Sequence, residues 1–186
     1  MTDRKQETTK IFGVYNQSIL SKKLHLSIRE VGKNLKKILE EKASELFQGK
    51  CIAEGFIKPG SISIISHSAG VVDGETIEIQ VIFDCMICSP VEGTLVECTT
   101  KTITKAGIHA TCSDKDGTIP LTVFIARDHH NTSSYFNNMK EDVTITARII
   151  GVRYELNDPY ICAIAALNHR THEKDNKNTR NKTAKK

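Results

Sequence analysis

The most regular pattern of apolar and polar residues runs from Ile77 to Phe83, where the two kinds alternate. The apolar positions, which would share one face of a strand, are Ile77, Ile79, Val81 and Phe83. A period of two predicts a half-buried antiparallel strand with one face in a core and the other in water. From Ile82 to Cys88 the apolar residues become nearly continuous, which predicts that both faces are covered there. Ser89-Pro90 ends the pattern, because proline has no N–H donor, and we interpret it as a joint between two domains.

Upstream of this strand, the pattern predicts one long helix. Ser27 and Glu30 have the spacing of a capping box, in which each side chain satisfies a backbone N–H group at the start of the helix. Apolar residues follow at the steps expected for one face of a helix: Ile28, Val31, Leu35, Ile38, Leu39, Leu46 and Phe47. Gly49 is suited to end it. The prediction is a helix of about five turns whose apolar stripe packs against a sheet.

The sheet itself is predicted from short strands on both sides of this helix. They cover residues 11–15 and 19–26 before the helix, and 51–57 and 61–72 after it. Asp73-Gly74 is a strong hairpin signal immediately before the alternating strand. These elements predict an α+β domain, with one long helix on an antiparallel sheet, over residues 11–89 after a flexible N-terminus of residues 1–10.

After the joint, no segment has a convincing helical period, and five short strands are predicted instead. They cover residues 94–103, 108–112, 118–125, 142–150 and 160–167. In the fourth strand, the alternation places Val143, Ile145, Ala147 and Ile149 inward, and Thr144, Thr146 and Arg148 outward. Gly151 would interrupt this strand as a bulge or a barrel corner. Five strands, with the irregular link 126–141 between the third and fourth, predict an all-β OB-type barrel over residues 90–167.

Composition restricts the class of protein. Of the 186 residues, 39% are hydrophobic and 26% are charged, which is ordinary for a globular protein. No apolar run approaches the ~20 residues of a membrane-spanning helix, and the polar N-terminus does not resemble a signal peptide. The six cysteines show no spacing typical of a disulfide framework, so we expect a reduced, intracellular protein.

Positive charge is concentrated at the C-terminus. Residues 168–186 contain seven Lys/Arg and two Asp/Glu, which gives this segment a net charge of +5. The whole chain has a net charge of +4, so residues 1–167 have a net charge of −1 and are close to neutral. We expect a disordered basic tail. Such a tail is either a solubilising segment or an electrostatic contact for an anionic polymer.

Several motifs of the predicted barrel are similar to those of S1-type OB domains. In chain order they are Gly93-Thr94-Leu95-Val96, Ile103-Thr104-Lys105-Ala106-Gly107, Asp116-Gly117 and Arg148-Ile149-Ile150-Gly151-Val152. The upstream domain adds Gly49-Lys50-Cys51, Gly55-Phe56-Ile57, Gly70 and Ser89-Pro90-Val91-Glu92-Gly93. In this order the motifs resemble the larger stalk subunit of multisubunit DNA-directed RNA polymerases, a family that includes the seventh subunit of the eukaryotic enzyme II and the archaeal E-prime protein. The richness in lysine, asparagine and isoleucine is similar to versions carried by large DNA viruses.

The resemblance covers residues 11–167 and implies a non-catalytic subunit without a cofactor or a metal. Such a subunit docks on the polymerase core together with a smaller helical stalk partner and presents its barrel to nascent single-stranded RNA. The residues that the resemblance places at the docking site are Gly55, Phe56, Ile57, Lys58, Pro59 and Gly60. The implied location is intracellular with the transcription machinery, in the nucleus, or in the cytoplasm or virion if the protein is viral.

RNA contacts are predicted on the second and third strands of the barrel, where OB folds bind single strands through aromatic stacking and basic groups. The candidates are Lys101, Lys105, His109, Phe124 and Arg127, with Arg148 and Arg153 as outer contributors. Ala106 and His109 occupy the positions where S1-type barrels often carry an aromatic pair, so electrostatic contacts should outweigh stacking. Phe124 could equally be a core residue, and the lysines could be ordinary surface residues.

No motif for catalysis or metal binding stands out, so we do not expect an enzyme. Cys85 and Cys88 have C-x-x-C spacing, but residues three apart on a strand point to opposite faces. Buried thiols are therefore expected rather than zinc ligands. His129 and His130, beside Asp128, fit a solvated loop better than a metal ligand or a catalytic base.

The sequence also permits a second function. The chain would then be a free S1-type RNA-binding or translation-associated protein with no polymerase partner. Such proteins often repeat the barrel, and this chain contains no repeat. The apolar stripe of the predicted helix and the apolar segment 82–88 favour a docked subunit, because exposed apolar surface usually contacts a partner.

Overall fold

The computed structural model describes residues 13–130, 136 and 138–168. The predicted flexible N-terminus, residues 1–10, and the predicted basic tail after Asn168 lie outside this part of the chain. The described residues form two compact units. One unit contains Tyr15–Ser89 together with Tyr154–Ile161, and the other contains Pro90–Arg153 together with residues 162–168.

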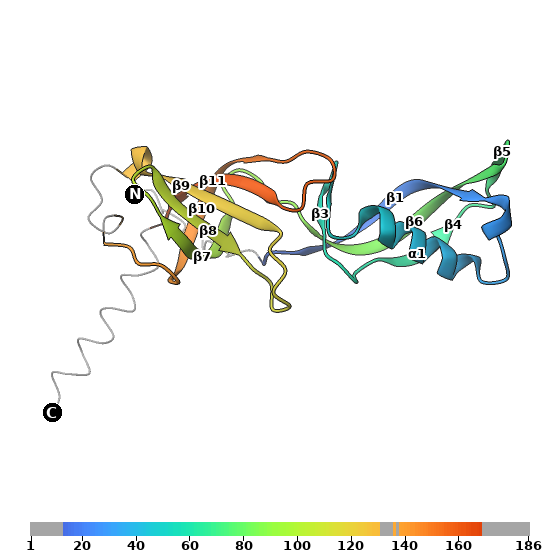
Figure 1. The fold of residues 1–186 in the computed structure, drawn as a ribbon, viewed down its shortest axis with the longest axis horizontal. Coiled ribbons are helices and arrows are strands. Elements are labelled where there is room, and N and C mark those ends of the chain that lie inside the picture. The colour runs from blue at the N-terminus through green and yellow to red at the C-terminus, as the bar shows by residue number, and fades with distance from the viewer. Residues whose placement is uncertain (1–12, 131–135, 137, 169–186) are drawn as a thin grey trace, which may run out of the picture. The chain divides into compact units, whose positions relative to one another are not determined.

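The first unit is built on a six-stranded antiparallel sheet (Figure 1). Its strands are β1 (Asn16–Ser27), β2 (Cys51–Ile52), β3 (Gly55–Ile57), β4 (Ser63–His67), β5 (Val71–Asp73) and β6 (Thr76–Cys88). The central strand is β6, which pairs with β1 along one edge and with β3, β4 and β5 along the other. The predicted hairpin at Asp73-Gly74 joins β5 to β6, with Asp73 opposite Thr76.

The helix of this unit is shorter than predicted. The capping box is present, since Arg29 N–H donates to Ser27 Oγ at 3.4 Å and Ser27 N–H donates to the Glu30 carboxylate at 2.8 Å. It starts only the 3-10 turn η1 (Ile28–Glu30), and α1 (Leu35–Phe47) follows as a separate helix of 13 residues. Val31 between them is extended. Because Val31 is β-branched and Gly32 has no side chain, both are poor helix formers, and the prediction of one continuous helix is wrong.

The apolar stripe of α1 is narrower than predicted. Leu39 and Ala43 are its buried residues, and the Phe47 ring stacks on Phe83 of the sheet with centroids 5.9 Å apart. Three residues that the sequence pattern places in the stripe, Ile28, Val31 and Leu46, are instead 47%, 38% and 41% exposed.

The alternation along β6 is confirmed on the face that α1 covers. The buried side chains of that face are Ile79, Val81, Phe83, Cys85 and Ile87. The prediction that both faces are covered from Ile82 onward is wrong, because Ile82 is 38% exposed and Met86 is half-buried. The strand keeps its period of two nearly to its end, where Cys88 is buried as well.

Three predicted strands of the first unit differ from the structure. Residues 13–15 are not in a strand, and the first strand begins at Asn16, so the prediction of a strand over 11–15 is wrong in its described part. The predicted strand 61–72 is two strands, β4 and β5, and the predicted strand 51–57 is the hairpin β2–β3. Gly55 begins β3 with a φ of 138°, and a Cβ there would lie 2.4 Å from the Cys88 carbonyl oxygen. Only glycine fits this approach of β3 to β6.

The segment Tyr154–Ile161, which the sequence pattern includes in the barrel range 90–167, belongs to the first unit. Cys51 N–H donates to the Asp158 carbonyl at 2.8 Å, and Asn157 N–H donates to the Cys51 carbonyl at 2.8 Å. The Tyr154 hydroxyl donates to the Ala53 carbonyl at 3.1 Å. These bonds satisfy the outer edge of β2, which would otherwise end the sheet with unpaired backbone groups.

The second unit contains a closed five-stranded barrel (Figure 1). Its strands are β7 (Leu95–Ile103), β8 (Gly107–Cys112), β9 (Leu121–Ala126), β10 (Thr144–Arg153) and β11 (Ile161–Leu167). Around the barrel they follow the order β7, β8, β9, β11, β10 and back to β7. The 3-10 turn η2 (Arg127–His130) follows β9. The arrangement is compatible with the predicted OB-type barrel.

The fourth barrel strand, β10, follows its predicted alternation except at Thr146, while Val143 lies just before the strand and is half-buried. Ile145, Ala147 and Ile149 are buried as predicted, and the predicted bulge is present as a register shift between Ile149 and Gly151. Thr146, which the alternation predicts to face water, is only 6% exposed. Its carbonyl accepts a hydrogen bond from Asn168 N–H at 2.9 Å, so the chain after β11 lies against it.

Candidate nucleic-acid interface

The two aromatic candidates lie side by side on the outside of the barrel. His109 on β8 and Phe124 on β9 are direct cross-strand partners, with ring centroids 4.8 Å apart at an interplanar angle of 47°. His109 is exposed and Phe124 is half-buried, whereas Val123 and Ile125 on either side of Phe124 are buried. The alternation therefore places Phe124 on the outer face, and it is not a core residue.

Gly107 makes room for the Phe124 ring. A Cβ at Gly107 would lie 2.7 Å from Phe124 Cζ and 2.9 Å from Cε2, and 2.4 Å from the Ile125 carbonyl oxygen. The ring thus lies across the backbone of Gly107 at the start of β8. The sequence pattern places Gly107 in a turn, but the structure shows that it is needed to seat an aromatic ring.

Two cationic candidates join this aromatic pair at the end of the barrel where β8 begins. Lys105 is exposed in the turn between β7 and β8. Arg127 opens η2, where its Nε donates to the Lys105 carbonyl at 2.7 Å and its backbone N–H donates to the Ala106 carbonyl at 3.0 Å. Its guanidinium carbon lies 5.1 Å from the centroid of the Phe136 ring. These contacts fix the position of Arg127 relative to the β7–β8 turn.

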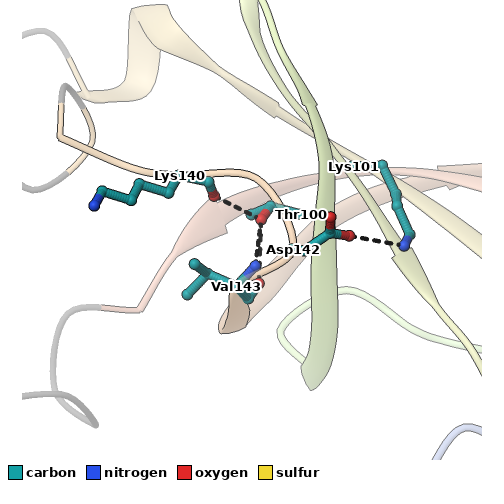
Figure 2. Close-up of polar contacts among 5 residues, drawn as sticks. All are labelled: Thr100, Lys101, Lys140, Asp142 and Val143. Carbon is teal, nitrogen blue, oxygen red and sulfur yellow. Dashed lines mark hydrogen bonds and ion pairs between the residues drawn. The ribbon is translucent and has the colours of Figure 1, made fainter.

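Lys101 lies on β7 next to Thr100, whose hydrogen bonds are shown in Figure 2. The buried Thr100 Oγ1 donates to the Lys140 carbonyl at 2.8 Å and accepts from Val143 N–H at 2.9 Å. Lys101 Nζ lies 3.1 Å from Asp142 Oδ1, in a pair whose side chains are 52% and 78% exposed. An exposed pair of this kind contributes little, so an RNA phosphate can compete with Asp142 for Lys101.

Arg148 and Arg153 lie apart from these residues. Both are exposed on β10, where Arg148 is opposite Ala166 and Arg153 is opposite Cys162 of β11. In the barrel order, β7 or β11 separates β10 from the β8–β9 pair. The seven predicted RNA contacts therefore do not form one surface. We call the set Lys105, His109, Phe124 and Arg127 the β8–β9 face, with Lys101 at its border.

His130 corrects the prediction that both histidines lie in a solvated loop. His129 is exposed, but His130 is only 8% exposed, and its Nε2 accepts a hydrogen bond from Leu167 N–H at 3.0 Å. Its ring stacks on Phe136, with centroids 5.4 Å apart at 13°. The adjacent aromatic residues Tyr135 and Phe136 within the polar link are the sequence signal that could have indicated a buried anchor here. Phe136 thus contacts both the His130 ring and the Arg127 guanidinium group.

The predicted docking motif, residues 55–60, is only partly accessible. Phe56 and Ile57 are 2% and 0% exposed, so their side chains belong to the core of the first unit. The Lys58 ammonium lies 5.5 Å from the centroid of the Tyr15 ring, and Pro59 and Gly60 are exposed. A partner could therefore reach Lys58, Pro59 and Gly60, while the first half of the motif has a structural role.

The predicted burial of Cys85 and Cys88 is confirmed, with exposures of 1% and 2%. Burial, with a smaller contribution from Asp84, raises the pKa of Cys85 to about 11, and burial beside Cys51 raises the pKa of Cys88 to about 12. Both thiols are therefore protonated at neutral pH. Among the described residues, no three His, Cys, Asp or Glu side chains are placed to hold a metal ion. No helix in the described part of the chain is long and apolar enough to cross a membrane.

Comparisons with known proteins identify no relative of this chain. The sequence matches no model of a known protein family. A search of curated proteins gives no match either.

Proposed function

We propose that this chain is a non-catalytic stalk subunit of a DNA-dependent RNA polymerase, whose S1-like barrel binds nascent RNA weakly and without sequence preference. The order of motifs from Gly49 to Val152 supports the polymerase assignment through its resemblance to the larger stalk subunits. The observation that carries RNA binding is the β8–β9 face, because it combines two cations with an aromatic pair, the exposed His109 and the half-buried Phe124, on an OB-type barrel.

The geometry indicates how single-stranded RNA would be held. A base can stack on the exposed side of the His109–Phe124 pair, while Lys105 and Arg127 contact the phosphates on either side of it. Stacking contributes roughly 1–3 kcal/mol per base and is tolerant of sequence, because every base has an aromatic face. With a single aromatic pair, most of the affinity should come from charge, and binding should weaken steeply with salt.

Fluorescence anisotropy with a labelled oligouridine across a range of salt concentrations tests this function. Replacing Lys105 and Arg127 together with glutamine should flatten the log–log salt dependence by about 1.4, if each meets one phosphate of a single strand. The matched control is Arg148→Gln with Arg153→Gln, which removes the same charge from β10. If both pairs flatten the salt dependence equally, RNA does not bind at the β8–β9 face.

A variant that ends at Asn168 separates the contribution of the basic tail. We expect it to flatten the salt dependence further while leaving binding at the barrel. If this deletion alone abolishes the salt dependence, residues after Asn168 are the binding element and the barrel takes no part.

The second candidate, a free S1-type RNA-binding protein, is favoured by one observation. Every residue of the β8–β9 face belongs to the second unit, so RNA binding does not require the first unit. Affinity purification of the tagged chain from cells that make the polymerase distinguishes the two. Recovery of the large polymerase subunits and a smaller helical partner supports the stalk subunit, whereas recovery of a monomer with RNA alone supports the free protein.

A further inference from the structure

The first strand, β1, forms one edge of the six-stranded sheet, because it pairs with β6 and with no other described strand. The hydrogen bond from Ile28 N–H to the Glu75 carbonyl, at 3.2 Å, continues the register of the β1–β6 pair and fixes its phase. In an antiparallel pair, alternate residues direct their backbone groups toward the partner strand and the others direct them away. The even-numbered residues of β1 therefore bond to β6, and the odd-numbered residues direct their N–H and C=O groups outward.

The other side of β6 agrees with this phase. Lys58 N–H donates to the Met86 carbonyl at 2.9 Å, and Ser68 N–H donates to the Gln80 carbonyl at 2.9 Å. The even-numbered residues of β6 thus bond away from β1. This leaves the odd-numbered residues of β6 to bond to the even-numbered residues of β1, with which they are in register.

A row of open backbone groups therefore runs along the outer edge of β1. The residues that carry it, all of them exposed, are Gln17, Ile19, Ser21, Lys23 and His25. Within the described part of the chain, none of their N–H and C=O groups forms a hydrogen bond. The next outward donor, Ser27 N–H, is capped by the Glu30 carboxylate at 2.8 Å, so the open row ends at His25.

The other borders of this sheet are covered or short. Asn157 N–H and the Asp158 carbonyl bond to Cys51 and cover the edge of β2. The border strands β4 and β5 have five and three residues, and short edges are one way in which natural sheets avoid unwanted pairing. With 12 residues, β1 is long enough to receive another strand.

We propose that the outer edge of β1 pairs antiparallel with the same edge of a second copy of this chain, so that two sheets join into one. A row of alternating donors and acceptors is matched by another extended polypeptide, whereas a nucleic acid or a lipid has no such row. Two-fold symmetry makes the edge complementary to itself, because each outward N–H meets a C=O of the second copy. All residues of this edge belong to the first unit, so the pairing does not rest on RNA binding by the barrel.

The charges of β1 select the register of the pairing. A two-fold axis at Lys22 or Lys23 would place like charges directly opposite each other, which is unfavourable. An axis at Ser21 instead places Lys23 opposite Ile19 of the second copy, and neither lysine then meets a cation. The same axis pairs the whole row Gln17–His25 with itself, so that every outward donor is used.

The two lysines do not prevent this approach. Lysine on an edge strand often deters pairing, but both side chains already have carboxylate partners within the unit. Lys22 Nζ lies 2.7 Å from Glu54 Oε1, and Lys23 Nζ lies 2.8 Å from Glu78 Oε1. In the proposed register, the aliphatic stem of Lys23 would also cover Ile19 of the second copy, a side chain that is 64% exposed in the single chain.

Hydrogen exchange of the full-length chain, read residue by residue at micromolar and near-millimolar concentration, tests the pairing. The outward amides of the row Gln17–His25 should exchange at least about tenfold more slowly at the higher concentration, where sedimentation should show a dimer in place of the monomer. The amides of Leu20 and Leu24, which bond to β6, are the control and should be protected at both concentrations. Fast exchange of the outward amides at both concentrations would overturn the proposal. Protection of these amides in a chain that sediments as a monomer would also overturn it, since another segment of the same chain would then cover the edge.

Substitutions at Ser21 test the axis. Ser21→Pro removes the outward N–H there and puts a ring in the path of the second copy, and proline is tolerated where the N–H of an edge strand faces outward. It should abolish the dimer. Ser21→Ala is the matched control, because it loses the same hydroxyl, which accepts from Gln80 Nε2 at 2.9 Å, but keeps the N–H. Ser21→Lys keeps every backbone group and should also give a monomer, since two lysines would face each other across the axis. A dimer in Ser21→Pro or in Ser21→Lys, or a monomer in Ser21→Ala, would overturn the proposal.

Discussion

His109 and Phe124 face each other across β8 and β9, with ring centroids 4.8 Å apart. Arg127, which begins η2 directly after β9, is tied to the turn before β8 by its hydrogen bond to the Lys105 carbonyl. The aromatic pair and the two cations therefore lie at one end of the barrel, where hydrogen bonds tie Arg127 to the backbone of Lys105 and Ala106. A side chain that is already held in place loses little conformational entropy when an RNA strand binds to it.

Replacing Phe124 with alanine should weaken RNA binding by roughly 5- to 150-fold, because one base loses its stacking partner. The salt dependence should stay unchanged, since no charge is removed. Anisotropy titrations at several salt concentrations measure both quantities. Ile164→Ala, which truncates an exposed apolar residue on β11, is the control and should bind like the parent. An unchanged affinity in Phe124→Ala would mean that RNA does not stack on this ring.

Replacing Gly107 with alanine should destabilise the barrel by about 1–3 kcal/mol, because the new Cβ meets both the Phe124 ring and the Ile125 carbonyl oxygen. It should also weaken RNA binding by displacing Phe124. Gly151→Ala is the control, since a Cβ there meets no atom within 4 Å. Chemical denaturation of the two variants provides the comparison. Equal stabilities would show that the approach of β8 to β9 can relax at little cost.

Replacing Thr100 with valine should cost about 1–3 kcal/mol, because the Lys140 carbonyl loses its donor and Val143 N–H loses its acceptor in a buried place. The shape of the side chain is retained, so packing should change little. Thr99→Val, on the same strand but half-buried, is the control. Denaturant unfolding reads out the difference, and similar losses in the two variants would contradict the role of the network in Figure 2.

The thiols should react in two classes. Cys162 is exposed, while Cys51, Cys85, Cys88, Cys98 and Cys112 are buried. Titration of the native protein with a thiol-specific disulfide reagent at pH 8 should therefore detect one thiol, and titration after denaturation should detect six. Cys162→Ser should remove the native signal. Rapid reaction of further thiols in the native state would show that the cores open easily.

Alkaline pH should destabilise the fold through Cys85 and Cys88. Their pKa values in the folded protein, about 11 and about 12, lie above the ordinary thiol pKa of about 8.5. Between these values the unfolded chain releases the thiol protons and the folded chain keeps them, so stability is complete below about pH 8.5 and falls as the pH rises toward 11. Urea unfolding from pH 7 to 10.5 should show a shallower decline in the double variant Cys85→Ala with Cys88→Ala. An identical decline would assign the effect to other groups.

Part of the structure follows from the sequence alone, because it depends on local geometry. The period of two along β6 and β10 determines which side chains point to the core, and it correctly buries Phe83, Cys85 and Ile145. The capping box at Ser27 and the bulge at Gly151 are equally local, since the first depends on two side chains three residues apart and the second on one missing side chain.

The rest was decided by contacts between residues far apart in the chain. Tertiary packing assigned Tyr154–Ile161 to the first unit and buried His130 against Phe136. It also separated Arg148 and Arg153 from the β8–β9 face. A sequence pattern identifies the face of a strand on which a side chain lies, but the neighbours it meets depend on which strands pair and in which register.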